Sequence, residues 1–333
     1  MRKNLNMIVL GVALLAGLIA PLVTGASSAG FYTEVLLGGL MAGVLYSLVA
    51  LGFVLIFKAS GVFNFAQGAM VLFAALSVAR MAEMMPLWVA ILLAVGIMVA
   101  LAFIIERLVL RPLVNQDPVV LLMATLGVTY FLDGFGQTVW GSDIYEINLG
   151  IAREPVMILG NLFEGGILIN KDDVAATVAA AVLVILLALF FQKTKTGRAL
   201  RAVADDHLAA QSIGIPLNRI WVIVWSLAGV VALVAGVIWG AKLGVQFSIS
   251  QVALKALPVV ILGGFTSIPG AIVGGLIIGV GEKMAEVFLG PVMVKAFDLA
   301  GGGIENWFAY VLALLFLLVL PQGLFGEKHI DRV

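Results

Sequence analysis

Long runs of apolar residues separated by short polar stretches make up most of the chain. Charged residues occur almost only between these runs; the stretch between Glu34 and Lys58, for example, contains none. Each charge-free run has about 20 residues or more, which is the length that an α-helix needs to cross a hydrocarbon core of roughly 30 Å. The pattern predicts an all-α fold, a polytopic bundle of membrane helices.

We expect about ten membrane segments. Continuous apolar runs lie near residues 6–24, 34–57, 65–82, 86–106, 118–139, 173–191, 219–242 and 304–321. The stretch 250–288 is also apolar, but Gly and Pro residues at 263–270 interrupt it and break a helix at that density. We therefore predict two further pieces, 250–263 and 268–288, which either span fully or form a re-entrant pair. Residues 1–333 are expected to form one transmembrane domain.

Basic residues orient the predicted bundle, because cytoplasmic loops carry an excess of Lys and Arg. If the segments alternate in direction, one side receives Arg2, Lys3, Lys58, Arg107, Arg111, Lys193, Lys195, Arg198, Arg201, Arg219, Lys328 and Arg332. That side is predicted to be cytoplasmic and to hold both termini, with loop 141–172 on the opposite side. The start of the chain also has features of a signal peptide, although we expect residues 6–24 to be retained as a span.

Composition narrows the class of protein further. Of the 333 residues, 62% are hydrophobic and 11% are charged, with 19 basic and 19 acidic side chains and no Cys, whereas a soluble domain has roughly 25% charged residues. The absence of a basic excess argues against a nucleic-acid binder. The two histidines, His207 and His329, lack the spacing of metal ligands, and neither a phosphate-binding P-loop nor a nucleophile–histidine–carboxylate set is present. We expect no metal, no cofactor and no enzymatic activity.

Two places could supply polar groups within the membrane. The first is the turn 60–68, where Asn64 could cap the following helix. The N–H groups at the start of that helix would then face a passing solute. An ordinary cytoplasmic turn with a cap would explain the same residues. The second is the break at 263–270, whose irregular backbone must be buried in protein or line a cavity.

A possible polar stripe lies on the span 118–139. The spacing of three to four residues places Thr125, Thr129 and Asp133 on one helical face, with Gln137 one turn further. The alternative is that Asp133 and Gln137 approach the external surface, where water would explain them.

The stretch 193–219 is too long for a turn and too apolar for a solvated loop. It predicts one helix with Leu200 and Val203 on one side and Arg198 exposed, followed by a second, short helix. The second helix is expected to end at Gly214, since glycine commonly ends a helix, and to carry Leu208, Ala209, Ala210, Ser212 and Ile213. A short amphipathic helix of this kind suits docking into a groove of another protein, or else lies on the lipid surface.

The segment Leu208–Gly214 resembles the Ala-Ala-x-x-x-Gly motif by which ABC import permeases engage their ATPases, although Leu208 stands where that motif usually begins with glutamate. Further motifs are similar to those of the LivH-type permeases of branched-chain amino acid ABC transporters. They are the run 39–52 with Asn64-Phe65-Ala66-Gln67-Gly68, then Glu106-Arg107-Leu108-Val109-Leu110-Arg111-Pro112-Leu113, Thr196-Gly197-Arg198-Ala199-Leu200-Arg201-Ala202, residues 262–271, and Leu320-Pro321-Gln322-Gly323-Leu324-Phe325-Gly326.

The resemblance implies a multi-pass permease of the bacterial inner membrane, surrounded by lipid. Its implied partners are a second, related permease, two cytoplasmic ATP-binding subunits and a periplasmic solute-binding protein, with no nucleic acid. The predicted pathway residues are Tyr46, Asn64, Gln67, Gly68, Thr125 and Thr129, and the predicted ATPase-coupling residues are Arg198, Leu208, Ala209, Ala210, Ile213 and Gly214.

One departure from the family leaves the solute open. The family's usual His-Gly-Glu after Asn-Phe-Ala is Gln67-Gly68-Ala69 here, within the predicted pathway. We therefore expect transport of branched-chain amino acids or a related small polar solute, driven by partner ATPases. The alternative is an ion-coupled secondary transporter or a channel, which would need ion-binding carboxylates in its core.

Overall fold

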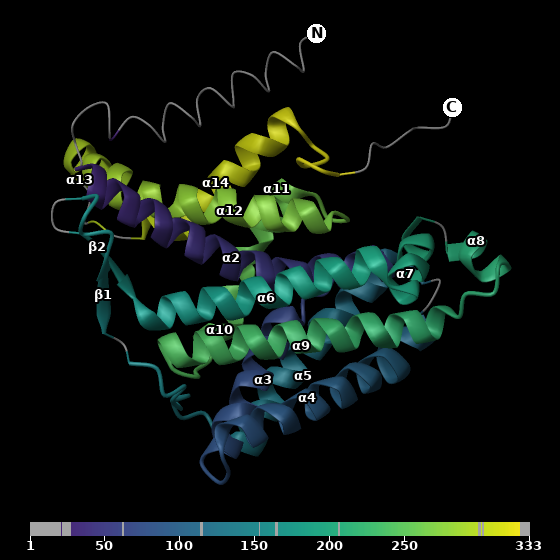
Figure 1. The fold of residues 1–333 in the computed structure, drawn as a ribbon. Coiled ribbons are helices and arrows are strands. Elements are labelled where there is room, and N and C mark those ends of the chain that lie inside the picture. The colour runs from purple at the N-terminus through teal and green to yellow at the C-terminus, as the bar shows by residue number, and fades with distance from the viewer. Residues whose placement is uncertain are drawn as a thin grey trace. The chain divides into compact units, whose positions relative to one another are not determined.

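The computed structural model describes residue 21 and residues 28–61, 63–113, 116–152, 154–163, 166–205, 207–298, 301 and 303–326. These residues are mostly helical (Figure 1). The α-helices are α2 (Ala29–Ser60), α3 (Gln67–Ala82), α4 (Leu87–Ile104), α5 (Pro118–Trp140), α6 (Lys171–Lys193), α7 (Lys195–Asp205), α8 (His207–Ser212), α9 (Leu217–Leu243), α10 (Ser248–Val252), α11 (Leu257–Gly263), α12 (Ile268–Met284), α13 (Gly290–Phe297) and α14 (Ile304–Val319). The remaining elements are the π-helices η1 (Ile105–Leu110) and η4 (Ala285–Leu289), the 3-10 helices η2 (Arg111–Leu113) and η3 (Ala253–Ala256), and the strands β1 (Pro155–Ile158) and β2 (Ile167–Asn170).

Five helices of the described chain are long and apolar enough to cross a membrane, and six if a bent pair counts as one span. The five are α2, α4 with its η1 and η2 extension, α5, α6 and α9. The expectation of about ten segments is therefore not supported. The fold is a multi-pass helical membrane protein with fewer full-length spans than the charge-free runs suggest.

Helix length explains most of the difference. The apolar runs near 65–82 and 304–321 form α3 and α14, which have 16 residues each and are therefore about 24 Å long. The stretch 250–288 forms short pieces, and the axes on either side of the break after Gly263 differ in direction by 116°. The expected first span, 6–24, lies almost entirely outside the described residues.

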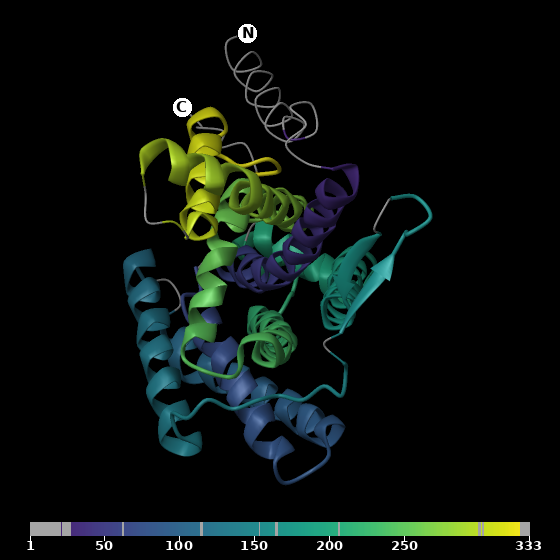
Figure 2. The same ribbon diagram turned by 90° about the vertical axis from the view of Figure 1, so that its left-hand side faces the viewer.

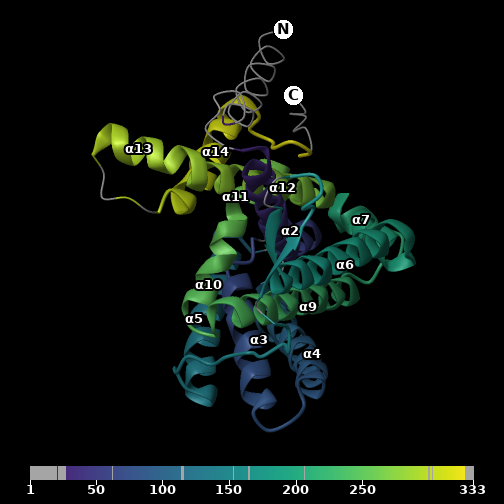
Figure 3. The same cartoon turned by 60° about the vertical axis from the view of Figure 1, so that its left-hand side comes forward.

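The helices separate into two compact units. Unit 1 contains residues up to Ser47, 151–179 and 257–333, and unit 2 contains 48–150 and 180–256. In unit 2, α9 packs against both α3 and α4, while α5 and α10 pack against α3 (Figure 3). In unit 1, α11, α12 and α14 pack together.

A short segment after α14 closes the break between α11 and α12 in unit 1. The backbone N–H of Leu324 donates to the carbonyl of Leu262 (2.8 Å), and that of Phe325 donates to the carbonyl of Gly263 (3.1 Å). These carbonyls end α11, where the last C=O groups of a helix lack intrahelical partners. The irregular backbone at this break is thus covered by protein.

Loop 141–172 contains a β-hairpin, so the fold is not purely α-helical (Figure 2). Strands β1 and β2 pair antiparallel, from Pro155 opposite Asn170 to Ile158 opposite Ile167. Ile167 is fully buried, and the Glu34 carboxylate of α2 accepts the N–H of Leu168 (3.1 Å). The charged residues of this segment predicted only a loop.

Candidate functional site

A buried pair of amides occupies the turn between α2 and α3 in unit 2. Asn64 and Gln67 have no solvent-exposed surface, although both amide groups are polar. Asn64 Nδ2 donates to Gln67 Oε1 (3.4 Å) and lies 3.8 Å from the thioether sulfur of Met70. Burial of an amide is unfavourable unless it is hydrogen-bonded, and these two side chains satisfy part of that requirement for each other.

Neighbouring helices complete this polar cluster. Gln67 Nε2 donates to the backbone carbonyl of Ala228 on α9 (3.4 Å). Thr125 of α5 is fully buried, and its hydroxyl accepts the N–H of Phe65 (3.4 Å) and lies 3.3 Å from the carbonyl of Phe63. We call Asn64, Gln67 and Thr125 the amide cluster. It joins the α2–α3 turn to α5 and α9.

Two glycines leave room for the cluster. A Cβ atom at Gly52 of α2 would lie 2.8 Å from Gln67 Cδ, closer than real Cβ contacts. A Cβ atom at Gly68 would overlap the backbone carbonyl of Ser250 on α10. The predicted pathway residue Gly68 is therefore a helix-contact glycine, and Gly52, which the sequence did not single out, determines where the Gln67 amide can lie.

Asn64 does not cap α3 as expected. The helix begins at Gln67, its N-cap residue is Ala66, and no side chain caps it. Asn64 Oδ1 instead accepts the N–H of Ala66 (3.1 Å), closing a local turn of the kind that Asn favours. The first N–H groups of α3 therefore have no side-chain acceptor at the cap.

The predicted polar stripe on α5 contributes only its first member to the cluster. Thr129 is partly buried, and its hydroxyl donates to the carbonyl of Thr125 in the same helix (2.9 Å). Gln137 is exposed, and Asp133 is partly exposed with one buried carboxylate oxygen that has no hydrogen-bond partner among the described residues. The structure thus brings together Asn64, Gln67 and Thr125.

Tyr46 belongs to a separate polar contact, in unit 1. Its hydroxyl donates to Glu282 Oε1 of α12 (3.1 Å), and both side chains are almost fully buried. The next residue of α2 is Ser47, whose Oγ lies 3.1 Å from the carbonyl of Ile272 on α12. No local sequence pattern points to this contact, because its two residues are 236 positions apart.

Glycines bring α2 and α12 together at this contact. A Cβ atom at Gly43 would lie 2.7 Å from the carbonyl oxygen of Gly275 and 2.8 Å from Leu276 Cα. A Cβ atom at Gly39 would lie 2.8 Å from Val280 Cα. We call this contact the glycine seam. The seam uses small residues for close helix approach, as is common between membrane helices.

A buried ion pair follows α4. Glu106 in η1 has no exposed surface, and Arg111 in η2 donates to both of its carboxylate oxygens, from Nη2 to Oε2 (2.9 Å) and from Nε to Oε1 (3.1 Å). Two parallel bonds between guanidinium and carboxylate are the strong form of this interaction. Both residues belong to the family-like motif at 106–113. Their opposite charges, five positions apart, were the sign of this pair in the sequence.

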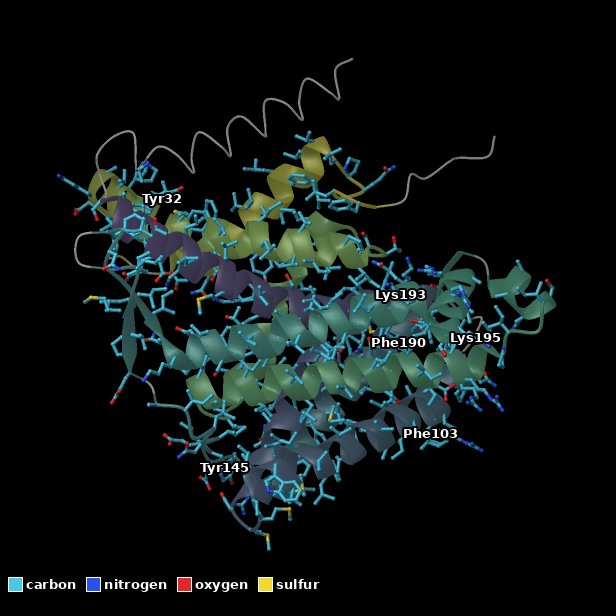
Figure 4. All side chains as sticks on the ribbon, in the orientation of Figure 1. Tyr32, Phe103, Tyr145, Phe190, Lys193 and Lys195 are labelled. Atoms are coloured by element: carbon cyan, nitrogen blue, oxygen red, sulfur yellow. The ribbon has the colours of Figure 1, made fainter. Side chains whose placement is uncertain are left out.

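The segment 193–219 forms the two helices that the sequence predicted. A Cβ atom at Gly197 would lie 2.6 Å from the backbone of Phe191, so α7 begins directly against the end of α6, where Phe190, Lys193 and Lys195 lie near one another (Figure 4). Leu200 and Val203 are buried and Arg198 is exposed, as predicted.

The short helix α8 presents only part of its predicted interface. Ala209 and Ile213 are exposed, and Ile213 has 74% of its surface accessible, but Ala210 is buried within the chain. Gly214 ends the helix with φ +84°. Its N–H donates to the carbonyl of Gln211 and that of Ile215 to Ala210, which is the Schellman arrangement. The side chain of Leu208 lies outside the described part.

No group of three or more His, Cys, Asp or Glu side chains suitable for a metal ion occurs among the residues that the structure describes. The amide cluster consists of amides, a hydroxyl and backbone groups. Such groups can bind and guide a polar solute, and no nucleophile with an adjacent base accompanies them in the amide cluster.

Comparison with known proteins places the chain in a family. Residues 35–320 match the family described as branched-chain amino acid transport system / permease component. The chain is 29% identical to the high-affinity branched-chain amino acid transport system permease protein BraD of Pseudomonas aeruginosa, over 91% of this chain and 98% of that protein.

Two LivH proteins show the same extent of similarity. The high-affinity permease protein LivH of Salmonella typhimurium is 27% identical over 91% of this chain and 98% of its own length. The probable branched-chain amino acid transport permease protein LivH of Methanocaldococcus jannaschii is 28% identical over 88% of this chain and 92% of its own length. With nearly the whole chain covered by a permease family and helices suited to crossing a membrane, the protein belongs to the family of branched-chain amino acid transport permeases.

Proposed function

We propose that this chain is the membrane-spanning subunit of an ABC importer for branched-chain amino acids or a related small polar solute. The observation that carries the proposal is the family match over residues 35–320, with relatives whose names state branched-chain amino acid transport. In this function the chain supplies the solute path and the coupling surface, while separate subunits hydrolyse ATP.

The amide cluster supports a solute path through unit 2. It places uncharged donors and acceptors inside a helical bundle, where a polar group needs partners. Both hydrogen bonds of the Gln67 side chain are 3.4 Å long, which is longer than the ordinary range for N–H···O bonds. Amides held this loosely can exchange their protein partners for a solute when the surrounding helices move.

The exposed face of α8 supports a docking role towards an ATP-binding subunit. Ile213 is a large apolar side chain on an otherwise polar, exposed helix end, together with Ala209. A few apolar anchors on a short helix suit insertion into a groove of a partner. In this role Ala210 acts from inside, packing α8 onto its own chain, and Arg198 lies on the neighbouring exposed surface of α7.

The complete importer would contain a second, related permease, two cytoplasmic ATP-binding subunits and a periplasmic solute-binding protein, with this chain in the bacterial inner membrane and both termini cytoplasmic. An ion-coupled transporter or channel is the competing function. That function needs ion-binding carboxylates in the core. The buried carboxylates Glu106 and Glu282 are hydrogen-bonded to Arg111 and Tyr46, and Asp133 lies outside the amide cluster, which favours the importer.

Uptake in the reconstituted importer tests the pathway. Asn64→Leu and Gln67→Leu should each lower leucine uptake at least tenfold while leaving recovery of the assembled complex unchanged. Ser77→Ala is the matched control, because Ser77 is buried in α3 and donates to the carbonyl of Phe73 in its own helix (2.7 Å). Normal uptake by both leucine variants would remove the cluster from the path.

Coupling is tested separately at α8. Ile213→Glu should leave the permease folded but reduce ATPase recovery and solute-stimulated ATP hydrolysis, since a buried unpaired charge is strongly unfavourable at an interface. Asn218→Glu adds the same charge at an exposed position on α9 and should have no effect. If Ile213→Glu assembles and couples normally, α8 is not the docking helix.

A further inference from the structure

A buried indole N–H on α9 has no hydrogen-bond partner among the described residues. Trp225 of α9 has 1% of its surface exposed, and its Nε1 atom lacks an acceptor in the part of the chain that the structure describes. A buried donor without an acceptor is unfavourable. Such a group in a native helix bundle calls for an explanation, and a solute that supplies the missing acceptor is one.

The position of Trp225 on α9 places it with the amide cluster. Trp221, four residues earlier, donates its indole N–H to the carbonyl of Ala59 near the end of α2 (3.1 Å). Ala228, three residues later, accepts from Gln67 (3.4 Å). Residues three and four apart share one face of a helix, so Trp225 lies on the face of α9 that meets the α2–α3 turn.

Other donors converge on the same turn. Helix α3 begins at Gln67 without a side-chain cap, and the first N–H groups of a helix point outward without intrahelical acceptors. The helix dipole adds partial positive charge at that end. Asn64 directs one amide hydrogen towards Met70 Sδ at 3.8 Å, and a thioether is a weak acceptor. The backbone N–H groups of Ala66 and Gln67 already have acceptors on Asn64, its Oδ1 (3.1 Å) and its carbonyl oxygen (3.3 Å). The donors of this region that lack a strong acceptor among the described groups are therefore Trp225 Nε1 and one amide hydrogen of Asn64.

The amide cluster itself contains no charged side chain. Asp133 is eight residues from Thr125 along α5, a distance of about 12 Å. Glu106 is already held by Arg111 through two bonds. Neutral N–H donors at a helix N-terminus are a known way to hold the anionic group of a transported solute within a membrane.

We propose that the N-terminal end of α3, together with Asn64, Gln67 and Trp225, binds the carboxylate group of the transported solute. The inference rests on the proposed function, because it names the part of the solute that the amide cluster recognises. Trp225 Nε1 and one amide hydrogen would donate to the carboxylate oxygens, and Gly52 keeps the Gln67 amide in place. The cluster is closed to solvent in the described conformation, so the carboxylate enters when the helices around it separate.

Three probes that share one side chain isolate the carboxylate. Leucine and 4-methylpentanoate carry it, and leucinamide does not. The assembled importer is purified in lipid nanodiscs without its solute-binding protein, and its melting temperature is followed as each probe is titrated. Leucine and 4-methylpentanoate should each raise the melting temperature with a saturable midpoint, and leucinamide should have at least a tenfold higher midpoint. Equal responses to leucine and leucinamide would overturn the proposal.

Trp225→Phe separates solute binding from folding. It removes the unsatisfied N–H, so the variant should melt at or above the temperature of the unmodified complex without solute. The leucine midpoint should nevertheless rise about tenfold or more, as expected for loss of a hydrogen bond to a charged group. Gln67→Glu should abolish the response, since a second carboxylate would repel the first. Ser77→Ala should leave the response unchanged.

Outcomes separate the site from the function. A complex that takes up leucine but shows no leucine-dependent shift, or a Trp225→Phe midpoint within twofold of the unmodified value, rejects the carboxylate site and leaves the importer function standing. An assembly that binds both carboxylates through Trp225 but takes up no leucine rejects the proposed solute and retains the site.

Discussion

The glycine seam of unit 1 and the amide cluster of unit 2 use glycine for different purposes. At the seam, Gly43 lets the backbone of α2 touch the backbone of α12, because a Cβ atom there would meet Gly275 and Leu276. At the cluster, Gly52 makes room for the end of a side chain, Gln67. Backbone cannot move aside for an added methyl group, whereas an amide can. A glycine that faces backbone therefore holds a fold together, and one that faces a polar side chain positions a functional group.

Substitution of a glycine at the seam should destabilise the protein more than substitution of Gly52 at the cluster. Gly43→Val places a branched side chain against backbone atoms at 2.7 and 2.8 Å, and we expect destabilisation of at least about 3 kcal/mol. Thermal melting and the yield of folded protein in membranes measure the loss. Gly38→Val is the matched control, since a Cβ atom at Gly38 meets nothing within 4 Å. If both variants fold equally well, the seam does not hold the helices together.

The buried contact beside the seam comes next. Tyr46→Phe removes the hydroxyl that donates to Glu282 Oε1, and loss of a hydrogen bond to a charged group costs about 1.5–3 kcal/mol. A lower melting temperature is expected. Tyr310→Phe removes the same hydroxyl group from a partly buried tyrosine of α14 and serves as the comparison variant. Uptake per folded molecule decides whether Tyr46 also belongs to the solute path; unchanged uptake would assign it to stability alone.

Gly52→Ala should separate stability from function. The added methyl group displaces the Gln67 amide and not the backbone, so destabilisation of about 1 kcal/mol is expected. Leucine uptake should fall further than stability, at least tenfold, because the amide no longer reaches its position. A variant that loses stability and uptake in proportion would show that Gly52 acts only through packing.

Two isosteric changes on α5 give the smallest effects. Thr125→Val leaves the N–H of Phe65 without its acceptor and should cost about 1 kcal/mol. Thr129→Val removes only a bond to its own helix and should change stability by less than about 0.5 kcal/mol. Melting temperatures of the two variants measure the contrast, and equal losses would place Thr129 in the cluster after all.

The sequence predicted what depends on local pattern. Charge-free runs identified α2, α4, α5, α6 and α9, and the Gly-Pro cluster identified the break after α11. The same rule overestimated α3 and α14, because a charge-free run contains the turns as well as the helix. The hairpin in loop 141–172 was missed, since its buried residues, such as Ile167, pack only through tertiary contact.

The candidate site was only partly predicted, because it also depends on tertiary contacts. Asn64, Gln67 and Thr125 stood out as polar residues in or beside apolar runs. Their partner Ala228 contributes only a backbone carbonyl, which no sequence pattern marks. Trp225 appears in the sequence as one aromatic residue among many apolar ones, and its unpaired N–H becomes visible only when its surroundings are known. The roles of Ala228 and Trp225 both depend on contacts between segments that are distant in the sequence.

The hydrogen bonds that Leu324 and Phe325 donate to the end of α11 have a consequence for biosynthesis. Ribosomes deliver the chain from its N-terminus, and the carbonyls of Leu262 and Gly263 emerge some sixty residues before the N–H groups that pair with them. During that interval two carbonyl groups at a helix end lack their final donors, a cost of several kcal/mol if lipid surrounds them. Insertion of this region is therefore completed late, and a nascent chain that stalls after α14 is a natural target for quality-control proteases.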